Sequence, residues 1–403
     1  MVQASLQLYR NAYSGLSTPM WWLALVMFIN RCGTMVIPFL TIYLTHKGFS
    51  LAQAGYVMGA FGAGAILGGY LGGRLTDRFG YLYVQVASLA LNGVLFIVLA
   101  QMQTLAQLMI CIFVLSSLGE AFRPANSAAI AAYSNDANRT RCYALNRLAI
   151  NLGWAIGPAI GGMLAIHSYA ALFWVDGLTC IGAAVLLLLV FRPKTNLKTE
   201  TVAQSPDTKK TSAYGDAIFL KGMFLIFLVG LCFFQLFSMI PVFYKEKIGL
   251  NEASIGWLLA MNGLIIAAVE MVLVYKLERK NHTADYLIVG SFIIGLSFLL
   301  LNIAPLFSVA LAAMLTVTFG EMLLFPFMNN FWVSRSNATN RGEYAALYTM
   351  SFSAAILLAP TLAAQIAARA GFDILWWGNF ALCCIAAAGF YFLKKSMHKD
   401  ERI

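Results

Sequence analysis

Twelve long apolar runs, separated by short polar segments, dominate the chain. Their ranges are 20–44, 52–76, 81–101, 105–133, 140–166, 169–191, 217–244, 252–275, 284–303, 306–334, 341–368 and 372–393. About 20 mostly apolar residues are enough for a helix to cross a bilayer. Because lipid offers no hydrogen-bond partner to the backbone, runs of this length are predicted to be α-helices. The pattern therefore predicts an all-α membrane protein with twelve transmembrane helices.

One polar segment is much longer than the others. Residues 192–216 form a Lys-rich linker that separates two groups of six runs. We therefore expect an N-terminal six-helix bundle over 1–191 and a C-terminal six-helix bundle over 217–403. Composition supports this interpretation, since 60% of the residues are hydrophobic and 11% are charged, against roughly 45–50% and 25% in soluble proteins. These values exclude a soluble enzyme, a disordered chain and a secreted disulfide scaffold.

The basic residues predict the orientation in the membrane. With the N-terminus inside, twenty of the 27 Lys and Arg residues fall on the inner side. The outer side receives only Lys47, Lys245, Lys247 and Arg369. By the positive-inside rule, both termini are expected in the cytoplasm, in a bacterial-type inner membrane. Topology then explains the net charge of +10, and no nucleic-acid partner is expected. The first twenty residues lack the features of a signal peptide, so the N-terminus is expected to be retained.

The two halves share a weak internal repeat. At an offset of 202, eight residues of the first half recur in the second, with Pro124 matching Pro326 and Arg139 matching Arg341. At an offset of 201, the pair Gly119-Glu120 matches Gly320-Glu321. Polar and proline identities in one register predict parallel repeats related by an axis along the membrane normal, which is typical of transporters.

Two glycine-containing motifs stand out. Residues 72–80 read GGRLTDRFG, and residues 153–162 read GWAIGPAIGG. In the second motif, glycines at every fourth position leave one helix face without side chains, so that another helix can approach closely. Pro158 removes a backbone hydrogen bond from that helix and permits a bend.

On these motifs the chain resembles the major facilitator superfamily over essentially its whole length. The first motif is similar to the superfamily's G-x-x-x-D-[RK]-x-G-[RK] loop, although Tyr81 replaces the last basic residue. The second is similar to the G-x-x-x-G-P-x-x-G-G signature of the drug:proton antiporter branch. The resemblance implies that Asp77 binds the start of span eleven near Arg341–Glu343, and that Asp136 pairs with Arg78. The residues expected to take part in gating are Gly73, Asp77, Arg78, Gly80, Asp136, Gly153, Gly157, Pro158 and Gly161.

Four charged residues stand out at mid-span: Arg31, Glu120, Arg123 and Glu321. Such groups are costly in lipid and are expected to face a cavity or a partner. Spans one, four, seven and ten line the central cavity in the superfamily. We expect Glu321 to carry a coupling proton, because no basic residue lies within a turn of it, and Glu120 to share or tune this role. The alternative is that both glutamates form permanent ion pairs with the two arginines.

Arginine offers a fork of donors that suits a carboxylate or phosphate. Arg31 and Arg123 are therefore expected to hold an acidic group of the substrate, unless they only neutralise the glutamates. Amide side chains on the same helices complete the expected substrate-binding set: Asn30, Asn126, Gln235, Asn329 and Asn330. No phosphate-binding loop is present. A proton gradient is thus the expected energy source, without a cofactor or metal.

The favoured interpretation is a monomeric, proton-coupled transporter that exports small organic molecules. A proton symporter, or an exporter of a carboxylate-bearing metabolite such as a peptide or siderophore, remains the alternative. The Asn30-Arg31 pair and the Gly-Glu…Pro pattern resemble proton-coupled peptide transporters as well, but the ExxER motif of that family is absent. A membrane-embedded enzyme is a remote third possibility, because no Ser-His-Asp order or metal-ligand cluster is found.

Overall fold

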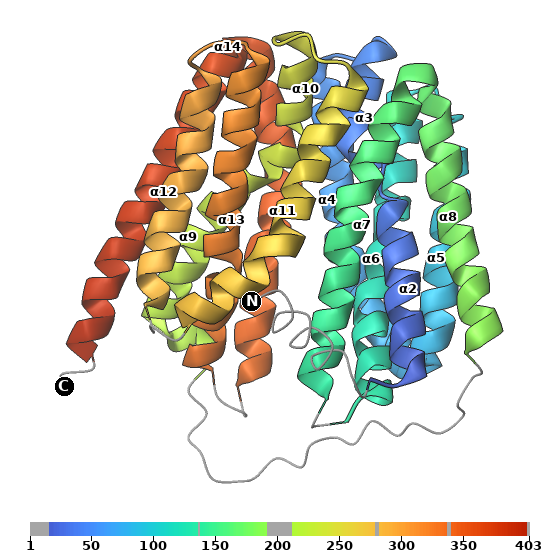
Figure 1. The fold of residues 1–403 in the computed structure, drawn as a ribbon, viewed down its shortest axis with the longest axis horizontal. Coiled ribbons are helices and arrows are strands. Elements are labelled where there is room, and N and C mark those ends of the chain that lie inside the picture. The colour runs from blue at the N-terminus through green and yellow to red at the C-terminus, as the bar shows by residue number, and fades with distance from the viewer. Residues whose placement is uncertain (1–15, 136–137, 192–211, 279–281, 337–339, 401–403) are drawn as a thin grey trace, which may run out of the picture. The chain divides into compact units, whose positions relative to one another are not determined.

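The computed structural model describes residues 16–135, 138–191, 212–278, 282–336 and 340–400 (Figure 1). Regular structure in these ranges is entirely helical. The first half contains α2 (Thr18–Cys32), α3 (Val36–His46), α4 (Leu51–Phe79), α5 (Tyr81–Leu99), α6 (Leu105–Tyr133), α7 (Arg139–His167) and α8 (Tyr169–Val190). The second half contains η1 (Ala213–Gly215), α9 (Ala217–Phe233), η2 (Phe234–Phe237), α10 (Met239–Glu246), α11 (Glu252–Glu278), α12 (Thr283–Leu301), α13 (Phe307–Arg335) and α14 (Arg341–Asp400).

Eleven stretches of the described residues are long and apolar enough to cross a membrane. The last of them, Glu343–Met397, is 55 residues long and includes two of the predicted spans. Its two helices meet at Gly371, whose φ of 86° breaks the helical geometry and favours glycine. The all-α membrane fold expected from the sequence is therefore confirmed. Most of the predicted linker, residues 192–211, lies outside the described residues.

Two predicted spans are not continuous helices, and here the sequence expectation is wrong. The run 20–44 is interrupted at Gly33–Met35, between α2 and α3, which Figure 1 shows as two separate blue segments. In the run 217–244, the α-helix α9 is followed by the 3-10 helix η2, and α-helical structure begins again with α10. Pro38 and Pro241 each occupy the third position of the restarted helix. Proline is tolerated in the first turn because that turn needs no backbone N–H donor.

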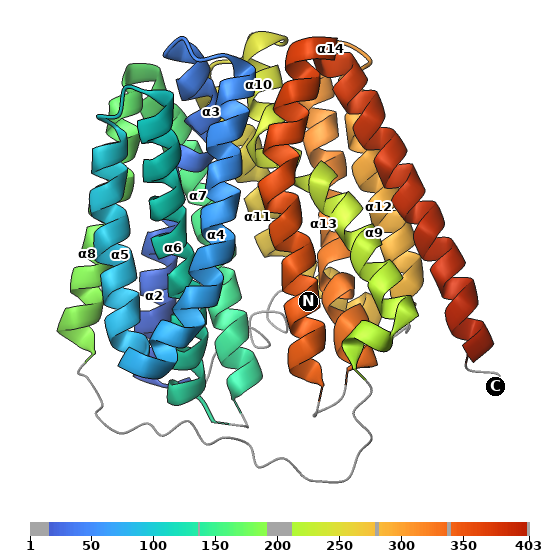
Figure 2. The ribbon, with the colours of Figure 1, turned by 180° about the vertical axis from the view of Figure 1, so that it is seen from behind.

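The chain divides into two compact units. Unit 1 comprises residues 1–37 and 63–199. Within it, α5 packs against α6 and α8, and α2 packs against α7 and α8 (Figure 2). Fully or nearly buried apolar side chains from five helices, such as Met20, Leu89, Phe122, Leu145 and Leu187, form its core.

Unit 2 comprises residues 38–62 and 200–403. In this unit α12 packs against α13 and α14, α9 against α14, and α11 against α13. Glycines on the first half of α4 allow close contact with α14: a Cβ at Gly55 would lie 2.5 Å from the Cβ of Ala364, and Thr361 Oγ1 donates to Gly55 O at 3.0 Å. Residues 38–62 thus group with unit 2 by their contacts.

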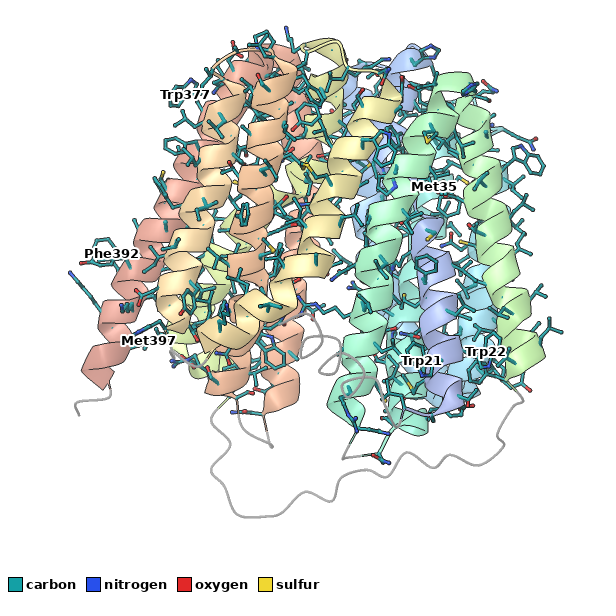
Figure 3. All side chains as sticks on the ribbon, in the orientation of Figure 1. Trp21, Trp22, Met35, Trp377, Phe392 and Met397 are labelled. Carbon is teal, nitrogen blue, oxygen red and sulfur yellow. The ribbon has the colours of Figure 1, made fainter. Side chains whose placement is uncertain are left out.

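The distribution of side chains is the reverse of that in a soluble protein. Large apolar side chains are exposed, including Trp21 (47%), Trp377 (53%) and Phe392 (64%) (Figure 3). Polar side chains such as Gln85 and Asp176 are completely buried. This arrangement suits a hydrocarbon solvent, in which polar groups must find partners inside the protein.

Candidate functional site

Three of the four predicted intramembrane charges meet in unit 1. On α6, Arg123 Nη1 donates to Glu120 Oε2 at 3.2 Å, as expected for residues three positions apart on a helix. Arg31, in the last turn of α2, interacts electrostatically with both of them. The Nε of Arg31 is buried and has no hydrogen-bond partner among the described residues. This cluster therefore contains an ion pair together with a second guanidinium that has unused hydrogen-bonding capacity.

The fourth charge, Glu321 on α13, lies in unit 2 and has different surroundings. Its side chain is buried, and its Oε1 accepts a hydrogen bond from Asn262 Nδ2 of α11 at 2.7 Å. The same Asn262 nitrogen donates to Thr318 Oγ1 at 2.9 Å. Among the described residues of this unit, no basic side chain forms a salt bridge with Glu321. Its one described hydrogen-bond partner is therefore a neutral amide.

The predicted substrate-binding amides bond to neighbouring groups within their own unit. Asn126 accepts from Gln85 at 3.2 Å and donates to Asn146 at 3.0 Å, which links α5, α6 and α7. Asn30 lies 3.8 Å from the Cys180 sulfur. The other three make these contacts: Gln235 Nε2 with Leu231 O and Ala359 O, Asn329 with Phe325 O and Trp332, and Asn330 with Thr283. Of the five, only Asn329 has an exposed side chain.

Asp176 of α8 has a role that sequence reasoning did not identify. Its carboxylate accepts hydrogen bonds from the backbone N–H groups of Met35 at 3.1 Å and Val36 at 2.8 Å. These are the first donors of α3, so Asp176 caps the helix that restarts after the break. The side chain is completely buried. Two sequence features could have indicated this arrangement: a proline four residues after Thr34, and an acidic residue in an otherwise apolar span.

The predicted glycine face of α7 packs on the same break. A Cβ at Gly161 would lie 2.8 Å from Met35 Cβ, and one at Gly157 would lie 3.0 Å from Cys32 O. A Cβ at Gly153 would lie closer still to the Cβ of Arg31. Pro158 is inside α7, between these contacts. The structure therefore brings Gly153, Gly157 and Gly161 together with the discontinuous part of the first span.

The first motif ends α4 and starts α5. Gly80 has φ 84° and ψ 153°, a conformation that side chains disfavour, and it precedes the first residue of α5. Gly72 packs closely on Ala121 of α6, whereas a Cβ at Gly73 would enter open space. Asp77 and Arg78 are exposed, and the Arg78 guanidinium lies over the Phe79 ring. Asp136, the predicted partner of Arg78, lies outside the described residues.

A further polar cluster in unit 2 joins the end of the linker to three helices. Asp216 caps α9 through the Phe219 N–H at 2.9 Å, and it accepts two hydrogen bonds from Arg335, at 2.8 and 2.9 Å, and one from Tyr344 at 2.9 Å. Although burial acts to raise the pKa of the Asp216 carboxyl, these hydrogen bonds outweigh it and the pKa is lowered. Glu343 accepts from Ser212 Oγ and the Ala213 N–H, both at 3.0 Å.

The comparison of sequences gives the family. The family model of the Major Facilitator Superfamily matches residues 23–355. The chain belongs to this superfamily.

Two relatives illustrate the range of this family. A protein of Planococcus maritimus named Na(+), Li(+), K(+)/H(+) antiporter is 26% identical over 413 residues, covering 93% of this chain and 95% of the relative. Multidrug resistance protein 1 of Bacillus subtilis is 24% identical over 348 residues, covering 84% and 87%. Among solved structures, a bacterial homologue of the human lysosomal transporter Spinster has a TM-score of 0.79 at 13% identity, over 94% of this chain and 97% of the other. At this identity the structural likeness shows the fold.

Membership of the major facilitator superfamily resolves the broader alternatives. The chain is a multi-pass membrane transporter of small molecules and not an enzyme. In the part of the chain that the structure describes, no group of three or more His, Cys, Asp or Glu side chains is arranged to hold a metal ion. The coupling ion and the substrate must be argued from the charged groups.

Proposed function

We propose that the protein is a proton-coupled antiporter of the bacterial inner membrane that exports small organic molecules, with Glu321 as the proton carrier. The observation that carries this proposal is the buried carboxyl of Glu321, whose only described hydrogen bond is from the neutral amide of Asn262 at 2.7 Å. An ionised carboxylate without a cation is costly in such surroundings, so the neutral acid is favoured there.

Alternating access gives this group its coupling role. When the carboxyl is reached by water from outside, it takes up a proton. When it is reached by water from the cytoplasm, it releases the proton, and the ionised form then favours binding of the next substrate. Because the proton and the substrate occupy the protein in turn, inward proton flow drives outward substrate flow. The names of two relatives, an antiporter and a multidrug resistance protein, support exchange and export.

A second candidate substrate class is favoured by the cluster in unit 1. Glu120 neutralises Arg123 directly, but the buried Nε of Arg31 has no hydrogen-bond partner among the described residues. A guanidinium with free donors is suited to a carboxylate or phosphate. The cluster therefore supports an organic anion as cargo, carried either in exchange for protons or together with them.

Glu321→Gln tests the proton carrier. Glutamine keeps the hydrogen-bonding shape but cannot exchange a proton, so uphill transport driven by a pH gradient should be abolished, while substrate exchange at equal pH should continue. The measurement uses purified protein in liposomes, with ethidium as the cationic probe and carboxyfluorescein as the anionic probe. Transport of carboxyfluorescein and not of ethidium would favour the anion class.

The matched control is Glu246→Gln, because Glu246 is the last residue of α10 and is not among the candidate residues. This variant should transport like the parent protein. If Glu321→Gln still accumulates substrate against its gradient, Glu321 is not the carrier. The direction of proton movement when substrate is added distinguishes antiport from symport.

A further inference from the structure

We infer that the Glu321 pocket also binds a monovalent alkali cation, Na⁺, in competition with the proton. This inference rests on the proposed role of Glu321 as the carrier, and it adds a second ion that the same carboxylate can take.

The hydrogen bonds of Asn262 mark the position of this cation. Its Nδ2 atom lies 2.7 Å from Glu321 Oε1 and 2.9 Å from Thr318 Oγ1. One positively polarised NH₂ group thus stands between a carboxylate oxygen and a hydroxyl oxygen. The hydroxyl hydrogen of Thr318 is directed away, to Met314 O at 2.7 Å, which leaves its oxygen free to accept. A cation placed where the NH₂ group stands would contact the same two oxygens.

One more oxygen can join the coordination. The carbonyl oxygen of Asn262 accepts no hydrogen bond from the described residues. A side-chain rotation that withdraws the NH₂ group from the position between the two oxygens would turn this carbonyl oxygen toward the cation. Carboxylate, hydroxyl and amide oxygens are hard ligands, the type that hard cations take in proteins.

Among the described residues of unit 2, no basic side chain forms a salt bridge with Glu321. At an offset of 201, the counterpart of Glu120 is Glu321, but the counterpart of Arg123 is Leu324. The charged groups on the packed helices lie elsewhere: Asp285 pairs with Lys394 and His282, and Lys245 pairs with Glu252. Glu270 lies eight residues beyond Asn262 on α11, Lys221 lies in the first turns of α9, and Arg369 and Asp373 lie beside the turn at Gly371.

The exchange is balanced in charge. The neutral acid has one proton on the carboxyl, and Na⁺ binding requires that this proton leave. Each bound Na⁺ therefore releases one proton, and the pocket stays neutral in both states. A low pH should weaken Na⁺ binding.

Binding of radioactive Na⁺ to the purified protein tests the inference, with choline chloride to keep the ionic strength constant. The parent protein should bind Na⁺ saturably at alkaline pH, release protons on binding, and lose Na⁺ as the pH falls. Thr318→Val keeps the side-chain shape and removes one ligand oxygen. Its Na⁺ affinity should fall about tenfold, equivalent to about 1.4 kcal/mol.

Thr316→Val is the matched control. Thr316 lies on the same helix and makes the same type of bond, to Ala312 O at 2.7 Å, but it is only half-buried and this bond is exposed, whereas Thr318 is buried. This variant should bind Na⁺ like the parent. Equal Na⁺ affinity in Thr318→Val and Thr316→Val would overturn the inference, as would parent-like Na⁺ binding by Glu321→Gln. If the parent protein binds no Na⁺ but Glu321→Gln abolishes proton coupling, the cation site is wrong and the proposed function stands.

Discussion

At the scale of single residues, the fold depends on a few charged groups with specific partners. Asp216 lies where the linker meets α9, and its carboxylate receives both a helix-capping N–H and a two-pronged hydrogen bond from Arg335. The pKa of Asp216 is lowered although burial alone would raise it. The folded state therefore stabilises the ionised form. Its contribution to stability is present above the unfolded pKa, near 3.8, and is lost as the pH falls through the folded value.

Arg335→Met should therefore destabilise the protein in a pH-dependent way. At neutral pH the loss of a hydrogen-bonded charge is expected to lower the free energy of unfolding by about 1–3 kcal/mol. As the pH falls through the lowered pKa of folded Asp216, the difference from the parent should shrink, and it should vanish once Asp216 is protonated in both proteins. Thermal unfolding in detergent across this pH range measures the effect. Lys394→Met, which removes a more exposed ion pair, is the control and should cost less than about 1 kcal/mol. A pH-independent loss in Arg335→Met would contradict the assignment.

At the scale of helices, the break in the first span is held by two other helices. Asp176 of α8 caps the start of α3, and glycines of α7 pack on the residues around the gap. The polar backbone groups exposed by the break are thereby satisfied inside the protein, as lipid requires.

Asp176→Asn tests this cap. The amide can accept one of the two backbone N–H groups, but its NH₂ would face the other, so a loss of about 1–3 kcal/mol in unfolding free energy is expected. Asp373→Asn, an exposed carboxylate on α14, should be nearly neutral. Thermal stability in detergent compares the two. Unchanged stability in Asp176→Asn would show that the cap is not needed for the helix break.

Helix positions could be predicted from the sequence, but helix interruptions could not. Apolar runs determine where helices lie because the bilayer thickness sets their length. Hydrophobicity carries no information on backbone conformation. The break at Gly33–Met35 could therefore not be predicted from it, even though Pro38 follows the break. The charged residues Glu120 and Glu321 were selected for their cost in lipid. Their partners Arg31 and Asn262 come from other helices, and their contacts depend on helix register and rotation, which a single sequence does not give.

At the scale of the whole molecule, the basic residues predict the side of the membrane that each segment faces. Trypsin should cleave within the Lys-rich segment 192–216 in inside-out vesicles and leave it intact in right-side-out vesicles. Mass spectrometry of the fragments would locate the cleavage. Trypsin added after detergent solubilisation controls for access in both preparations. Cleavage of this segment in sealed right-side-out vesicles would reverse the predicted orientation.

The two halves have diverged at one position in a way that divides the work between them. Glu120 has an arginine one turn away on its own helix, whereas Glu321 has a leucine at the matching place. If both descend from a duplicated ancestor, one copy retained a permanent counter-charge and the other gave it up. Only the Glu321 carboxylate must then bind an ion from the surrounding solution to become neutral. Such an ion can be released on the opposite side of the membrane.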